Sequence, residues 1–404
     1  MFLLRKNLAA ASEVIDASSD FHYLSKESCY LDSACQTLRP QQVITAETEY
    51  YEQYNACGGR VKYAWGAKVD EKVRTTRKLL LAQAGKSEKD YCVAFTLNTT
   101  YGINLVLHQL AQNEFSRIVT SDIEHNSVFL PSMSFAKKRS VDRLVLPRLK
   151  DGSVQYTAAD LSRSIVLMNS MSNIDGRTAG NVEQLTTDAH THGGIVLIDA
   201  AQGFAHDSER LKDTDFDAAF GSGHKMYGPS IGFIIMKRSL LARLDPFFLG
   251  GGTVTDVKKD TYSLVGEGEE AHAILEPGLQ NWGGIIGLGS AVTWLNSQHE
   301  AMLHEKKIAT FLYEGLKQHA RIHLFNTQPS PIQSFYVEGI DSHKISLYLS
   351  EQNIMCRSGH FCCHNYLDHQ LQLPPLVRVS LGLHNTQTHV EKFLGALTKI
   401  LSAL

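Results

Sequence analysis

The chain has 404 residues, of which 43% are hydrophobic and 20% charged, which is enough for one large α/β domain with a substantial core and a smaller second domain. The formal net charge of -3 disfavours nucleic acid and anionic membranes as partners, and no run of like charges offsets it. Polar and acidic residues over Asn7–Asp20 exclude the apolar core of a signal peptide, and no later apolar run has membrane-spanning length. We therefore expect a cytoplasmic protein.

Strand-like apolar runs recur through the middle of the chain, and segments with helical periodicity separate several of them. This alternation predicts a mostly parallel sheet sandwiched by helices. The expected strands are Tyr91–Leu97, Arg117–Thr120, Arg143–Leu146, Ser164–Met168, Gly194–Asp199, Ala218–Gly221 and Gly232–Lys237.

The pattern changes after about residue 286. A long helical stretch over Ala301–His319 precedes a strand-like Ser334–Val337, and a final helix runs to Leu404. We predict a large domain over 27–285 and a smaller α/β domain formed by 1–26 together with 286–404.

An acid and a lysine follow two neighbouring predicted strands. Asp199 ends one strand, and Lys225 follows the next in Ser222-Gly223-His224-Lys225. Taken singly, the acid is more often a turn or capping residue and the lysine a solvated charge. Together, beyond the carboxyl ends of strands, they fit a pyridoxal phosphate (PLP) site, in which the lysine amine forms a Schiff base and the acid keeps the pyridine nitrogen protonated.

Hydroxyl and imidazole groups follow other strands at the same expected edge. Thr99 and Thr100 stand between a strand and a helix, where side chains and helix N-terminal amides can hold a phosphate, although such threonines are often only helix caps. Ser222 and His224 offer further phosphate contacts. His125 is placed to stack on the pyridine ring, although a lone histidine is more often structural.

Seven cysteines are scattered without CxxC spacing, which predicts neither a disulfide framework nor a metal site. Cys362 and Cys363 differ from the rest because they lie in a polar loop with cationic neighbours that can stabilise a thiolate. If this loop is extended, successive side chains point to opposite faces, so one of the two thiols alone reaches a substrate.

Taken together, these segments resemble class V aminotransferase-fold PLP enzymes, and most closely cysteine desulfurases and selenocysteine lyases of the short-loop branch. The resemblance covers nearly the whole chain. It rests on Tyr30–Ala34, Thr99–Asn104, Glu124–Asn126, Ser172–Asn173, Asp199–Gln202, Ser222–Pro229, Gly250–Gly252, Gly283–Gly287 and the loop Arg357–Cys362.

The resemblance implies a type I PLP-dependent transferase fold, with a large seven-stranded, mostly parallel sheet domain and a smaller α/β domain. It implies that Lys225 carries PLP and moves the substrate Cα proton, that Cys362 takes the substrate sulfur as a persulfide, and that His125 stacks on the ring. The cofactor residues it implies are Thr99, Thr100, His125, Asn173, Asp199, Gln202, Ser222, His224 and Lys225.

The substrate is expected to be L-cysteine or a related amino acid, converted to alanine. Asn173, Arg357 and Arg378 are the residues implied for its binding, since a guanidinium suits a carboxylate. The resemblance also implies a homodimer, a sulfur-acceptor protein and a role in iron–sulfur cluster assembly.

Three positions depart from the family pattern. Phe361 replaces a second loop histidine, Tyr101 an acidic residue, and Leu279 a threonine that reaches the phosphate across a dimer interface. Two other readings stay open beside the desulfurase. One is another class V PLP enzyme, such as a C–S lyase, selenocysteine lyase, epimerase or transaminase, in which Cys362 is incidental; the other is a scaffold that keeps the fold without efficient chemistry.

Overall fold

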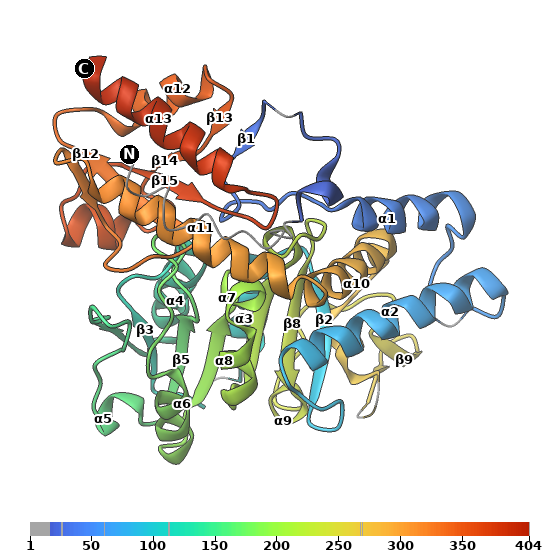
Figure 1. Cartoon of the computed structure of the whole chain (residues 1–404). Coiled ribbons are helices and arrows are strands. Elements are labelled where there is room, and N and C mark those ends of the chain that lie inside the picture. The colour runs from blue at the N-terminus through green and yellow to red at the C-terminus, as the bar shows by residue number, and fades with distance from the viewer. Residues whose placement is uncertain are drawn as a thin grey trace.

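A computed structural model of the chain describes residues 17–25, 27–59, 61–111, 114–266, 268 and 270–403. Its centre is a seven-stranded sheet, in which β8 runs antiparallel to both neighbours and all other pairs are parallel (Figure 1). The predicted strands and the mostly parallel sheet are confirmed. In spatial order the strands are β2 (Tyr91–Thr96), β8 (Gly232–Lys237), β7 (Ala218–Ser222), β6 (Ile195–Asp199), β5 (Ser164–Asn169), β3 (Arg117–Ser121) and β4 (Asp142–Leu146).

Both faces of this sheet are buried because successive strand residues point to opposite sides. In β6, Val196 and Ile198 belong to one apolar cluster, and Ile195 and Leu197 belong to the other. Helices α3 (Thr99–Gln109) and α4 (Asn126–Arg139) pack on the second face. The first face is covered by α2 (Ala64–Gln83), α6 (Val182–Thr191), α7 (Gly203–His206), α8 (Ser208–Asp213) and α10 (Trp282–Asn296).

A second, antiparallel sheet lies beyond one end of the first (Figure 1). Its strands, in spatial order, are β11 (Ile322–Leu324), β12 (Ile332–Val337), β15 (Leu376–Ser380) and β14 (Arg357–Gly359). The helices that share its apolar core are α11 (His299–Lys317), α12 (Ser342–Ser350) and α13 (Gln387–Ala403). The long helix predicted over Ala301–His319 is therefore α11.

The remaining elements are short, apart from α1, and join the two sheets or extend from them. The strand β1 pairs in parallel with β13, next to the smaller sheet, and β9 and β10 form a hairpin. The bounds are α1 (Gln41–Gln53), α5 (Ala158–Leu161), α9 (Arg238–Leu241), β1 (Cys29–Tyr30), β9 (Val254–Val257), β10 (Tyr262–Leu264) and β13 (Ile354–Met355), with single turns at Ser18–Phe21, Gly223–Lys225 and Ala271–Leu275 and a π-helix at Asn365–Gln370.

The predicted domain division at 285/286 falls inside the uninterrupted helix α10, which packs on α1 and α2. The division into 27–285 and 1–26 with 286–404 stays a prediction. Residues 1–16, expected on the smaller domain, lie outside the described residues. Ala17 follows them, and its amide donates to the carbonyl of Leu383.

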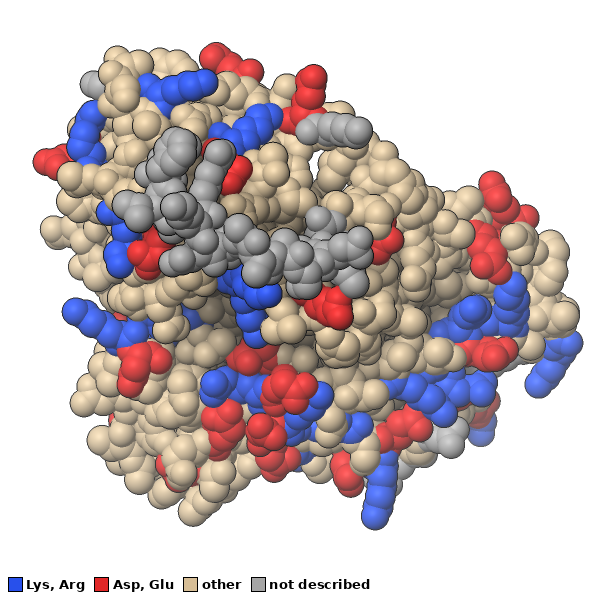
Figure 2. Space-filling view, viewed as in Figure 1, with Lys and Arg blue, Asp and Glu red and all other residues tan. Residues whose placement is uncertain are grey.

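Basic and acidic side chains are interspersed over the face of the molecule shown in Figure 2. Within the described ranges, no helix combines the length and apolarity needed to cross a membrane.

Candidate active site

The predicted site residues gather at the carboxyl edge of the large sheet, which faces the smaller sheet. Asp199 ends β6 and Ser222 ends β7, while Lys225 closes the single helical turn after β7. His125 precedes α4 after β3, and Thr99 begins α3 after β2. Parallel strands explain this convergence, because their carboxyl ends share one edge.

Charge couples the predicted lysine and acid. Burial lowers the pKa of Lys225, while Asp199 raises it, and Arg378, Cys35 and Cys362 also act on it. Burial raises the pKa of Asp199, and Lys225 opposes this effect. One Asp199 carboxylate oxygen accepts from the Ala201 amide at 2.9 Å. A buried acid beside a cation with a depressed pKa is the arrangement expected where proton transfer is needed.

Hydroxyl groups meet where α3 begins. The side-chain oxygens of Thr99 and Ser222 lie 2.7 Å apart, and the Thr99 amide also donates to the Ser222 hydroxyl. The side chain of Thr100 is exposed and contacts the Ser127 hydroxyl at 2.6 Å. This cluster at a helix N-terminus has the donors that a phosphate requires. His224 is half-buried beside Lys225, and burial lowers its pKa to about 4.

His125 is fixed by its place as the cap of α4. Its Nδ1 accepts from the Ser127 amide at 3.0 Å, which fixes the plane of the ring. Burial is the main cause that lowers the pKa of His125 to about 4, and the positive charges of Lys225 and Arg378 lower it further. The imidazole is therefore neutral near pH 7.

Gln202 follows Asp199 by three residues and is 4% exposed. Its Nε2 donates to the carbonyl of Ala34 at 2.6 Å, and its Oε1 has no hydrogen-bond partner in the described part of the chain. A buried polar atom without a protein partner needs a ligand or water. Together with the acid, the lysine and the hydroxyl cluster, this orphaned oxygen makes the donor set suitable for PLP.

Arg378 reaches the site from the smaller sheet, where it lies on β15. It is 3% exposed, donates to the carbonyl of Asn173 at 2.9 Å and pairs with Asp32 at 3.1 Å. Its Nε has no partner among the described residues. Arg357, on β14 opposite, is half exposed and pairs with the other Asp32 oxygen at 3.3 Å. Two predicted substrate-binding arginines thus share one acid.

The two adjacent thiols have opposite environments. Cys362 is exposed, whereas Cys363 is 1% exposed and donates to Asn173 Oδ1 at 3.4 Å. Burial raises the pKa of Cys363 far above its usual value, so its thiol stays neutral. The expectation of an extended loop is wrong, because Phe361 and Cys362 have φ of 48° and 59°. The left-handed turn, with the Cys362 carbonyl accepting from Asn126, separates the two side chains instead.

The sequence prediction missed residues whose roles depend on distant contacts. Asp32 links both arginines, and Ser127 contacts both Thr100 and the ring of His125. Phe361, noted only as a departure, places its ring 4.6 Å from the Arg378 guanidinium and its carbonyl on Asn173 Nδ2. Asp32 stands in a segment that resembles the family, but no local sequence pattern predicts that it pairs with Arg357 and Arg378.

The arrangement of an edge-mounted lysine and acid with an arginine from a second sheet matches one family. The chain belongs to the aminotransferase class-V family, which it matches over residues 29–393. Membership implies a PLP cofactor, and the fold is that of the type I PLP-dependent transferases.

Within this family the chain is similar to cysteine desulfurases, so the resemblance expected from the sequence is confirmed. It is 33% identical to a probable cysteine desulfurase of Haemophilus influenzae over 398 residues, covering 95% of this chain and 89% of that protein. An apo cysteine desulfurase of Thermococcus onnurineus NA1 superposes with a TM-score of 0.88 at 27% identity, over 98% of this chain and 100% of the other. A cysteine desulfurase of Escherichia coli gives 0.84 at 26% identity, over 96% and 98%.

Proposed function

We propose that this chain is a PLP-dependent cysteine desulfurase, which converts L-cysteine to L-alanine and leaves the sulfur as a persulfide on Cys362. The observation that carries the proposal is the contrast between the two neighbouring thiols. Cys362 is exposed and close enough to Lys225 to influence its pKa, while Cys363 is buried and neutral. A sulfur acceptor needs such an accessible thiol beside the lysine.

The residues suited to PLP are Thr99, Thr100, Ser222 and His224 for the phosphate, with Asp199 for the pyridine nitrogen, Gln202 nearby and Lys225 for covalent attachment. When bound, PLP supplies an electron sink at the substrate carbon. Asp199 is buried, and Lys225 opposes the rise that burial causes in its pKa. Its carboxylate would hold a proton on the ring nitrogen. His125, neutral in this site, would cover the ring without adding charge.

Arg378 and Asn173 are suited to hold the substrate carboxylate. Asp32, Phe361 and the Asn173 carbonyl fix the guanidinium from three sides, so little conformational freedom is lost when a carboxylate binds. The unpartnered Nε of Arg378 leaves a donor for that contact. Arg357, half exposed at the mouth, would add a weaker, solvent-screened attraction.

The sulfur step begins with the Cys362 thiolate attacking the substrate sulfur. A new S–S bond forms as the C–S bond breaks, and the electron pair of the C–S bond goes to carbon. Lys225, returning a proton to carbon, completes alanine. The persulfide sulfur then passes to the thiolate of an acceptor protein, or leaves as sulfide when a dithiol reduces it.

The finer partner and location assignments belong to the same proposal. The exposed Cys362 supports transfer to an acceptor protein, and we assign the chain to sulfur supply, such as iron–sulfur cluster assembly, in the cytoplasm. Exposed apolar side chains at Tyr51, Trp65 and Leu279 support a homodimer, since large exposed apolar residues often mark interfaces. Leu279, 77% exposed, brings no hydroxyl to a partner's phosphate.

The decisive experiment compares Cys362→Ala with Cys363→Ala, a matched pair of adjacent thiols. Purified protein is given L-cysteine and a dithiol, and alanine, sulfide and pyruvate are measured, with mass spectrometry of the loop peptide after one turnover. We expect Cys362→Ala to lose sulfide and alanine release while the visible spectrum still changes on cysteine addition. Cys363→Ala should keep most activity, because its thiol is buried.

Four results would contradict this proposal. Full alanine formation by Cys362→Ala, or a persulfide found on Cys363 alone, would remove the role of Cys362. Pyruvate and ammonia in place of alanine would instead identify a C–S lyase. No product from the unchanged protein, given several sulfur and selenium amino acids, would favour the scaffold reading.

A further inference from the structure

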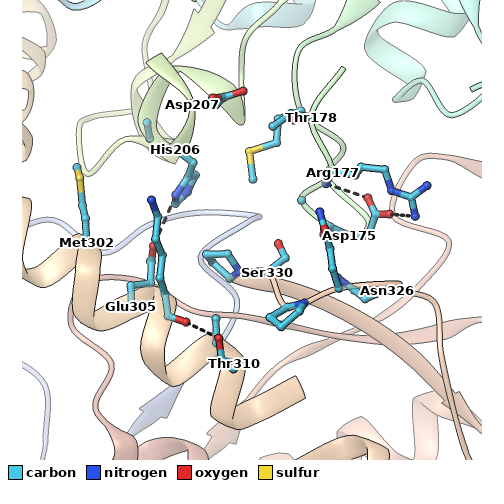
Figure 3. Close-up of a pocket in the computed structure, with 18 of the residues that line it drawn as sticks. Asp175, Arg177, Thr178, His206, Asp207, Met302, Glu305, Thr310, Asn326 and Ser330 are labelled. Carbon is cyan, nitrogen blue, oxygen red and sulfur yellow. Dashed lines mark hydrogen bonds and ion pairs between the residues drawn. The ribbon is translucent and has the colours of Figure 1, made fainter. Parts of the chain in front are cut away.

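A cavity of about 390 Å³, lined by none of the candidate active-site residues, lies between α7, α11 and the loops over 171–178 and 326–331 (Figure 3). Tyr227, two residues after Lys225, forms part of its wall, so the cavity lies behind the lysine segment. Its volume is in the range of small-molecule sites.

The buried acidic residue that lines the cavity is Glu305, on α11. This residue is 4% exposed, and its Oε1 has no hydrogen-bond partner among the described residues. Its Oε2 lies 3.8 Å from His206 Nδ1, across the cavity on α7 (Figure 3). Burial lowers the pKa of His206 to about 4, so this neighbour brings no positive charge near pH 7.

The other acids around the cavity already have cationic partners. Asp175 pairs with Arg177 at 2.9 Å, and Asp207 pairs with Arg210 at 3.0 Å. Lys306, next to Glu305 on the helix, is exposed. Glu305 is therefore the acid of the wall that combines a buried oxygen without a hydrogen-bond partner and the lack of an arginine partner among the described residues.

The walls are fixed before any ligand binds. Asn326 Nδ2 donates to the carbonyls of Asp175 and Ile332, which ties the two loops together. Gly176, with φ of 68°, permits this close approach, because a Cβ there would lie 2.1 Å from Ser330 Oγ. A preformed wall reduces the entropy lost on binding.

Apolar side chains also line the cavity. Met171, Met302 and Leu383 line it together with the prolines of the 326–331 loop, and they suit a short hydrocarbon skeleton. A metal ion is poorly matched, since the described residues contain no cluster of three His, Cys, Asp or Glu side chains in position to hold one. With a metal ion poorly matched, the ligand that best suits the buried Glu305 carboxyl is an organic cation with N–H groups that donate hydrogen bonds.

We propose that this cavity binds a small organic ammonium ion, with its N–H group on Glu305 and its hydrocarbon part against Met171, Met302 and Leu383. The site does not depend on the function proposed above. Its occupant is defined by a protonated amine nitrogen and a skeleton of amino-acid size.

The test uses two ring compounds of one shape, piperidinium and the neutral tetrahydropyran. Calorimetry on the full chain should give piperidinium about tenfold or more tighter binding, as expected of a charge-assisted hydrogen bond. Glu305→Gln, which keeps the size and removes the charge, should abolish this preference. Glu314→Gln, on the exposed side of the same helix, is the control and should retain it.

A second readout does not require a variant. Burial raises the pKa of Glu305 to about 8, whereas Lys306 opposes this. The facing groups His206, Tyr227 and the paired Asp207 bring no further cation. Binding of piperidinium at pH 7 should therefore release close to one proton, seen as a dependence of binding heat on buffer, and tetrahydropyran should release none.

The proposal is overturned if both compounds bind equally, if Glu305→Gln keeps the preference, or if no proton is released. A crystal soaked with piperidinium that shows it beside Lys225 rather than Glu305 would also overturn it.

Discussion

Two buried acids lie near the two ends of the segment Lys225–Tyr227, Asp199 near Lys225 and Glu305 near Tyr227. The lysines beside them differ in exposure. Asp199 lies within the electrostatic reach of the Lys225 amine, whereas Glu305 has an exposed lysine and a neutral histidine for neighbours. Burial raises the pKa of both, to about 8 for Glu305. The comparison teaches that burial favours the neutral acid at both positions, and that a neighbouring lysine opposes this effect without cancelling it.

The comparison predicts that changes around Asp199 reduce activity, while a change at Glu305 alters stability. The largest expected effect is that of Lys225→Ala. Loss of the amine should reduce alanine formation by at least 10²–10⁴-fold, about the contribution of a positioned proton-transfer group. Borohydride reduction and peptide mapping should find the pyridoxyl label on Lys225 in the unchanged chain. The exposed Lys212→Ala is the control, and a label on another lysine would contradict the assignment.

Asp199→Asn is expected to have the next largest effect. The amide cannot hold the ring proton as a carboxylate does, and a hydrogen bond to a charged group contributes about 1.5–3 kcal/mol, or roughly 10- to 150-fold in rate. Turnover should fall by that factor in a variant that still unfolds cooperatively in urea. Near-normal turnover would mean that the pairing of Asp199 and Lys225 serves the fold rather than the chemistry.

Arg378→Lys and Arg357→Lys form a matched pair that separates a buried cation from an exposed one. Lysine keeps the charge and loses the planar fork, so we expect KM for L-cysteine to rise about tenfold for Arg378→Lys. The change for Arg357→Lys should stay within about threefold, because its ion pair is solvent-screened. Equal effects on KM would assign the carboxylate contact to both arginines.

Glu305→Gln should have the smallest effect on activity, and its effect should appear in stability. The folded pKa is raised from 4.5 to about 8, so the contribution of this acid to stability is fully present below pH 4.5 and is lost as the pH rises through 8. Glutamine does not titrate. The variant should therefore gain stability relative to the unchanged chain between about pH 5 and pH 8, by on the order of 1 kcal/mol per pH unit. Urea unfolding measures it, and a pH-independent difference would contradict the raised pKa.

Strands and their carboxyl-edge residues could be predicted because they depend on local patterns. Continuous apolar runs marked all seven strands of the large sheet, and Asp199, Ser222 and Lys225 follow directly from where those runs end. Parallel topology then brings these ends together whatever the loops do. The identity of the family followed from the same short segments.

Contacts between residues far apart in the chain were decided only by the tertiary structure. The pairing of Asp32 with both Arg357 and Arg378 joins segments more than 300 residues apart. The contact of the Phe361 ring with Arg378 joins a turn to the strand β15. The left-handed backbone at Phe361 and Cys362 likewise has no local signal, because neither residue favours positive φ. The cavity at Glu305 exists because α7, α11 and two loops meet. Sequence thus determined which groups follow each strand, while packing decided which of them touch, because only the folded chain brings distant segments within hydrogen-bonding distance.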